Sequence, residues 1–160
     1  MITVRRAGVG DVGAIRQIGL TTWPVAYAGL VSDEFITDGL AQWWSPQAVE
    51  RGIRNGITLV AADGDQLVGI VGLGREGDFW VMWKLYVLPD HQRNGVGKAL
   101  LDAAIEALPE GTTELLLDVL VGNEQAIGFY RANGFGEAQK TPDRDLGVEL
   151  MWMRLDLQTA

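Results

Sequence analysis

LYVLPDHQRNGVGKAL, residues 85–100, carries the most informative local pattern in this chain. Its apolar first part ends at Pro89, two glycines follow at Gly95 and Gly97, and an apolar spacing of three and four residues begins there. Glycines let a backbone turn tightly, and the free N–H groups at the start of a helix bind phosphates. The stretch therefore predicts a strand, a phosphate-binding turn at residues 92–97 and a helix.

Two better-known glycine loops do not fit this turn. A P-loop needs a glycine five positions before Gly97 and a Ser or Thr after the lysine, but Gln92 and Ala99 stand at those positions. A dinucleotide fingerprint that starts at Gly95 needs a small third residue where the chain has Leu100. A turn that only lets the helix pack is the remaining alternative.

A second motif lies downstream of the first. Residues 115–121, LLLDVLV, predict a strand, and a helix follows from Asn123, whose side-chain oxygen is suited to cap the first turn. Gly134 is suited to supply the left-handed residue that ends this helix.

Together the two blocks resemble the GNAT superfamily of acyl-CoA-dependent N-acyltransferases. Residues 92–97 match its Q/R-x-x-G-x-G/A element, and residues 123–135 match its N-x-x-A-x-x-F/L-Y-x-x-x-G-F block. The resemblance extends more loosely over nearly the whole chain. It implies an α/β sandwich with a mixed, mostly antiparallel central sheet that is splayed at the acetyl-CoA site.

The resemblance also implies how acetyl-CoA binds. Backbone groups of the strand pair with pantetheine as an additional strand would, and the amides of residues 93–98 hold the pyrophosphate. The cofactor-binding residues expected in this way are Leu85, Tyr86, Val87, Gln92, Arg93, Asn94, Gly95, Val96, Gly97, Lys98, Asn123, Ala126 and Tyr130. Four basic residues near these blocks suit an anionic cofactor, unless they are ordinary solvated side chains: Lys84, Arg93, Lys98 and Arg131.

The implied reaction is direct attack of an amine on the acetyl thioester, which requires a base for the ammonium and an acid for the thiolate. Tyr130 matches the family tyrosine near the sulfur and is expected to be the acid. The alternative is a core aromatic paired with Phe129.

The base is less clearly marked. Many relatives carry a glutamate on the strand before the phosphate loop, where this chain has residues 80–82, WVM. Asp118 precedes Tyr130 by twelve residues, as does a glutamate thought to be the base in similar ribosomal-protein N-terminal acetyltransferases. An aspartate reaches less far, so a water would intervene. Asp118 could instead be exposed or bonded to an amide, and Glu34 in a first helical turn is a third candidate.

Composition limits the remaining possibilities. The 160 residues suit a single domain over residues 1–160, and the chain has no cysteine and one histidine, so no metal site is expected. A net charge of −8 disfavours nucleic acid and permits a cationic substrate. No apolar run is long enough to cross a bilayer and no leader pattern opens the chain, so we expect no membrane partner and a cytoplasmic protein.

Aromatic residues mark the expected acceptor side. Trp23, Tyr27, Trp43 and Trp44 suit a cation or an apolar group, or fill the core between helices and sheet. The acceptor is then a primary amine of a small molecule or a peptide, and a homodimer is possible because dimers are frequent among similar proteins. The alternative function is a non-catalytic acyl-CoA-binding module, against which Asn123 and Tyr130 weigh.

The expected order of elements follows from the apolar patterns. Pro24 is expected to break the first helix, and a polar loop at residues 140–147 is expected to separate the last two strands. We expect strands at residues 3–6, 57–62, 66–74, 79–88, 115–121, 135–139 and 148–155, and helices at 11–23, at 32–44, from 45, after the phosphate turn and from 123.

Overall fold

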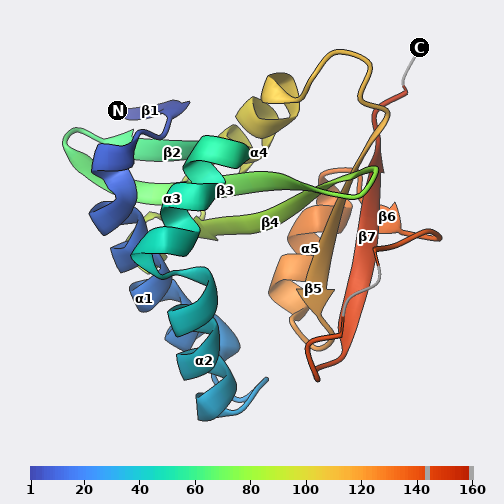
Figure 1. Cartoon of the computed structure of the whole chain (residues 1–160), viewed down its shortest axis with the longest axis horizontal. Coiled ribbons are helices and arrows are strands. Elements are labelled where there is room, and N and C mark those ends of the chain that lie inside the picture. Colours follow the sequence, from blue (N-terminus) through green and yellow to red (C-terminus); the bar gives the residue numbers. More distant parts are fainter. Residues whose placement is uncertain (143–144, 159–160) are drawn as a thin grey trace.

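A seven-stranded sheet with the order β1-β2-β3-β4-β5-β7-β6 forms the centre of the computed structural model, which describes residues 1–142 and 145–158 (Figure 1). All neighbouring strands are antiparallel except β4 and β5, which are parallel. The sheet is therefore mixed and mostly antiparallel, as the sequence predicts. The strands are β1 (Ile2–Arg6), β2 (Ile57–Asp63), β3 (Gln66–Glu76), β4 (Phe79–Val87), β5 (Glu114–Leu120), β6 (Gly136–Glu137) and β7 (Leu150–Asp156).

Within the described residues, five α-helices and two short 3-10 turns cover the two faces of the sheet. Helices α1 to α3 pack on one face around a cluster that includes Ile15, Trp44 and Ile70, and α4 and α5 pack on the other. The helices are α1 (Val12–Tyr27), α2 (Asp33–Trp43), α3 (Pro46–Asn55), α4 (Val96–Ala107) and α5 (Glu124–Ala132), with turns η1 (Val9–Asp11) and η2 (Pro89–His91).

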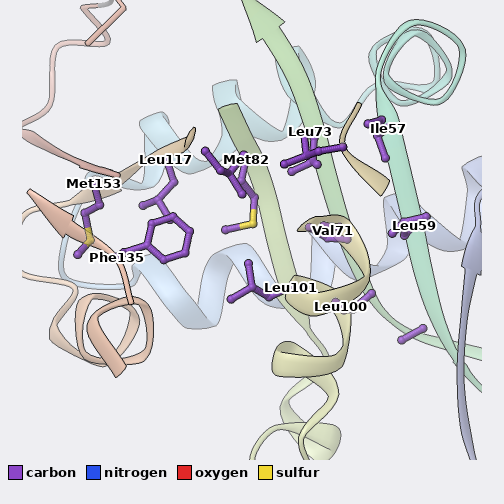
Figure 2. Close-up of a cluster of buried hydrophobic side chains, with 14 of the residues drawn as sticks. Ile57, Leu59, Val71, Leu73, Met82, Leu100, Leu101, Leu117, Phe135 and Met153 are labelled. Carbon is purple, nitrogen blue, oxygen red and sulfur yellow. The ribbon is translucent and has the colours of Figure 1, made fainter. Parts of the chain in front are cut away.

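One continuous apolar core joins the two halves of the sheet beneath α4 and α5. Figure 2 shows the side chains of β2, β3 and β4 on one side, those of β5 and β7 on the other, and Leu101 of α4 between them. Leu100, Leu101 and Leu117 are at most 1% exposed, so this core is closed to solvent. Burial of this apolar surface holds the halves together where backbone pairing does not.

Strands β4 and β5 separate soon after they meet. Val81 and Leu116 form their only cross-strand pair among the described residues, and beyond it the two strands run apart (Figure 1). The expected splay at the carboxyl ends of these strands is therefore confirmed.

An extra residue in β4 sits next to this separation. Leu73 of β3 pairs with Met82, and Gly72 pairs with Lys84, so the register of the two strands shifts by one residue at Trp83. Such a bulge bends a strand and increases its twist. The bulge also shifts the alternation of side chains by one residue: Met82 before it and Leu85 after it both pack into the α4 core, while Tyr86 packs against the α1 cluster.

Two expectations about the elements are wrong. Helix α1 runs through Pro24 to Tyr27, since Trp23 and Tyr27, on either side of the proline, pack edge-to-face at 5.0 Å and hold the last turn. The last hairpin is shorter than expected: β6 has two residues and β7 begins at Leu150. Residues 143 and 144 of the expected loop lie outside the described residues.

Within the described ranges, no helix combines the length and apolar content that crossing a membrane requires.

Candidate active site

A cleft of about 1290 Å³ lies where β4 and β5 diverge. Its walls come from α1, α2 and α3 on one side and from β5 and α5 on the other, and its floor from β2, β3 and β4. The start of α4 closes one end. The cleft therefore brings both sequence motifs and the expected acceptor side to one place.

The start of α4 presents free backbone donors to this cleft. Gly95 has φ 78° and caps the helix without any side-chain hydrogen bond. The first intrahelical bond runs from Ala99 N–H to the Gly95 carbonyl at 3.0 Å, which leaves the N–H groups of residues 96–98 without an intrahelical acceptor. Such a helix end attracts anions. The residues of the loop that line the cleft are Gln92, Arg93, Gly95, Gly97 and Lys98, and Arg93 is also left-handed, with φ 70°.

Two other loop residues do not present their side chains to the cleft. The Val96 side chain is 1% exposed and packs into the core, and Asn94 does not line the cleft. Lys98 forms an exposed ion pair with Asp102 at 3.2 Å. Arg131 is exposed and is not part of the cleft lining, so it is an ordinary solvated side chain.

The edge of β4 that faces β5 is open along residues 85–87. The Leu88 N–H donates to Val68 of β3, and the Tyr86 carbonyl lies on the same side, 3.3 Å from where a Cβ on Gly69 would be. Because successive peptide groups of a strand point to opposite sides, Leu85 and Val87 face the open edge. The Val87 carbonyl accepts from Gln92 Nε2 at 3.0 Å.

The expectation for Tyr86 therefore needs correction. Its backbone is paired within the sheet, so that only Leu85 and Val87 of the three expected residues present backbone groups to the cleft. Tyr86 contributes its side chain instead.

Helix α5 places Tyr130 in the cleft wall. The Asn123 side chain caps the helix by accepting from Ala126 N–H at 3.4 Å, and Gly134, with φ 97°, closes it. Tyr130 packs edge-to-face on Phe129 and Phe135 at 5.6 and 5.7 Å. Burial, helped by the nearby Tyr27 and Asp118, raises the pKa of Tyr130 above its ordinary value, so that the phenol is protonated at neutral pH.

Asp118 and a pair of tyrosines lie near Tyr130. Asp118 lies on β5, is partly buried, and lines the cleft. The hydroxyls of Tyr27 and Tyr86 share a hydrogen bond of 2.6 Å across 59 residues of sequence. Burial raises the pKa of Tyr27, with a further contribution from Asp118. Sequence reasoning placed the two tyrosines separately and missed their pairing, which no local pattern marks.

Lys84 lies in a different place from the one expected. Its Nζ donates to the Trp43 carbonyl at 2.7 Å and sits 4.2 Å from the centre of the Trp44 ring. The ammonium thus reaches the corner between α2 and α3, away from the phosphate turn, and is not solvated at the surface. Burial lowers the pKa of Lys84 to about 8.

This buried charge predicts a pH-dependent gain in stability on replacement. The difference between 10.5 and about 8 corresponds to a penalty of about 3 kcal/mol on the charged form, at about 1.4 kcal/mol for each pH unit. The penalty is fully present below pH 8 and disappears as the pH rises towards 10.5, because the unfolded chain then also loses the proton. Lys84→Met should therefore raise the melting temperature at pH 7, and its advantage over the wild type should shrink by pH 10. A constant difference, as expected for exposed Lys140→Met, would contradict the buried charge.

The remaining residues expected near the site differ in whether they line the cleft. Glu34 is exposed on the first turn of α2 and does not line the cleft, so it is not in place to act as a base. Trp23 and Trp44 are core residues that also line the cleft, and Trp43 is half-buried beside them. Residues 1–142 and 145–158 hold no group of three His, Asp or Glu side chains that could bind a metal.

Comparisons with known proteins identify the family of this chain. The sequence model described as "Acetyltransferase (GNAT) family" matches residues 15–135. A spermidine N(1)-acetyltransferase of Thermoplasma acidophilum is 26% identical over 155 residues, which are 92% of this chain and 96% of the relative. Peptidyl-lysine N-acetyltransferase YiaC of Escherichia coli K12 is 30% identical over 137 residues, with 82% of each chain covered.

A solved structure shows the same fold. The crystal structure of PaiA N-acetyltransferase from Thermoplasma acidophilum in complex with coenzyme A matches with a TM-score of 0.86 and 23% identity, over 98% of this chain and 99% of that chain. With the family match over residues 15–135, these findings show that the chain belongs to the GNAT acetyltransferase family.

Proposed function

We propose that this protein transfers the acetyl group of acetyl-CoA to a primary amine of a small molecule or peptide. One observation carries the proposal: a single cleft holds an uncapped helix start, an open strand edge, a protonated tyrosine and a carboxylate. The names of its relatives, which act on spermidine and on peptidyl-lysine, point to the same acceptor class.

The residues present fit acetyl-CoA. The N–H groups of Gly97 and its neighbours in the first turn of α4 suit the pyrophosphate, and a Cβ on Gly97 would extend into the cleft wall 3.5 Å from Phe129. Leu85 and Val87 offer strand-like partners for the pantetheine amides. Asn123 and Ala126 line the same wall at the start of α5.

Two side chains then divide the proton transfers. Acetyl-CoA supplies an acetyl thioester, and the amine nitrogen forms the C–N bond as the C–S bond breaks. Asp118 takes the proton of the ammonium through a water, since an aspartate on β5 has a short reach. Tyr130 gives its proton to the departing sulfur, and its raised pKa keeps that proton in place until the sulfur gains charge.

Thiol release from acetyl-CoA with a panel of primary amines tests the proposal, with CoA binding measured in parallel by calorimetry. Amine-dependent release is expected. Binding of CoA without turnover on any amine would favour the alternative, a non-catalytic acyl-CoA-binding module.

Gly97→Val is expected to weaken CoA binding by at least about a hundredfold, because a branched side chain blocks the approach of the pyrophosphate to several charge-assisted hydrogen bonds. Gly97→Ala should bind nearly normally, since the matching family element accepts alanine and the added methyl makes only ordinary contact with Phe129. Gly128→Val, on an exposed face of α5, controls for the change in helix propensity. Calorimetry that finds equal affinity for Gly97→Val and wild type would remove the phosphate site from this turn.

A further inference from the structure

Three cross-strand neighbours form a row on the floor of the cleft. Thr58 of β2 pairs with Gly72 of β3, and Gly72 pairs with Lys84 of β4. All three line the cleft. Because Gly72 has no side chain, the aliphatic stem of Lys84 passes over it, 3.6 Å from where a Cβ on Gly72 would be, and Thr58 lies on the other side of the glycine.

The ammonium of Lys84 has no carboxylate partner in the part of the chain that the structure describes. Its contacts are a backbone carbonyl of Trp43 and the face of Trp44, which satisfy one donor and leave the charge unbalanced. Burial lowers the pKa of this ammonium, as withdrawal of a cation from water does. Buried charges are normally paired, and an unpaired one in a binding cleft calls for a partner on the ligand.

The charges of the whole cleft favour the same ligand. The chain carries a net charge of −8, yet cations predominate in the cleft lining even without Arg93 and Lys98 at the phosphate end. The remaining charged residues of the lining are Arg51, Arg75, Glu76, Lys84 and Asp118. Asp118 lies on β5, whereas Lys84 lies on β4 and reaches the end of α2, so the carboxylate and the ammonium belong to different parts of one cleft.

We propose that the acceptor is an amine that also carries a carboxylate, and that Lys84 binds this carboxylate over Gly72, with the Thr58 hydroxyl as a second donor. This inference rests on the proposed function. The amine of such an acceptor lies towards Asp118 and its carboxylate towards Lys84. A polyamine would instead place a second cation against Lys84, so the preference should differ from that named for the spermidine relative.

Matched pairs of amines test the inference in the full chain. Each pair consists of an amino acid and its decarboxylated twin: phenylalanine with phenethylamine, and lysine with cadaverine; spermidine is added as a polyamine. Wild type should favour the carboxylate member in kcat/KM by about ten- to hundredfold, the range for one hydrogen-bonded charge. Lys84→Gln should abolish the preference, and Lys84→Glu should reverse it in favour of cadaverine and spermidine. Lys140→Gln, an exposed lysine outside the cleft lining, should keep it.

A binding measurement separates this inference from the proposed function. N-acetylphenylalanine and N-acetylphenethylamine are titrated into CoA-saturated wild type and Lys84→Gln protein by calorimetry. Tighter binding of the carboxylate compound, lost in Lys84→Gln, supports the inference even if no amine turns over. Equal binding or equal kcat/KM within the pairs overturns it, while amine-dependent thiol release would still support the transferase. Calorimetry with CoA alone checks that the Lys84 variants are folded.

Discussion

Tyr130→Phe is expected to lower kcat by about two to four orders of magnitude, the usual range for loss of a general acid, and to leave CoA affinity nearly unchanged. The ring packs on Phe129 and Phe135, and phenylalanine keeps these contacts while it removes the hydroxyl. The melting temperature should therefore change little. Steady-state kinetics, CoA calorimetry and thermal melting together measure the three quantities.

Tyr27→Phe is the comparison variant for this experiment, since it removes a different hydroxyl of the same cleft. Full activity of Tyr130→Phe with every good amine would return Tyr130 to a packing role. A large loss of kcat in Tyr27→Phe alone would assign the general acid to the Tyr27–Tyr86 pair.

Asp118→Asn should also reduce kcat by about two to four orders of magnitude, because an amide has the shape of the carboxylate but cannot take up the proton. A base must be ionised to act, so wild-type kcat should fall as the pH is lowered, and the variant should lose this acidic limb. The affinity of Asp118→Asn for CoA should equal that of the wild type. The profile of kcat against pH for both proteins is the measurement.

Asp38→Asn provides the control, since this exposed residue of α2 does not line the cleft. An unchanged pH profile in Asp118→Asn would mean that water removes the proton of the ammonium without help from Asp118. Glu34 is not a substitute, because it lies outside the cleft lining.

The sequence predicts best the features that depend on neighbours a few residues apart. The cap at Asn123, the left-handed Gly134 and the helix start after Gly95 all follow from local backbone requirements, and each is found where the motifs place it. The fold follows from the same motifs through the family resemblance. The positions of Tyr130 and Asp118 in one cleft follow from it as well.

Features that depend on distant residues were missed. The Tyr27–Tyr86 bond joins a helix end to a strand far along the chain, and its partners could not be matched from one sequence. The direction of Lys84 depends on the bulge at Trp83, which no composition rule marks. The continuation of α1 through Pro24 also depends on tertiary contacts, because the aromatic contact of Trp23 and Tyr27 outweighs the helix-breaking tendency of proline.

The bulge at Trp83 lies where β4 and β5 separate, and this separation makes room for a ligand at the expense of sheet stability. Every further pair between β4 and β5 beyond Val81 and Leu116 would add backbone hydrogen bonds, and it would also fill the slot in which a ligand has to lie. The bend leaves two strand edges short of partners in the free protein. A ligand that completes the edge of β4 supplies those missing bonds and makes the folded chain more resistant to heat. Selection for melting temperature alone would favour closure of this gap, and with it a sturdier protein that no longer has an active site.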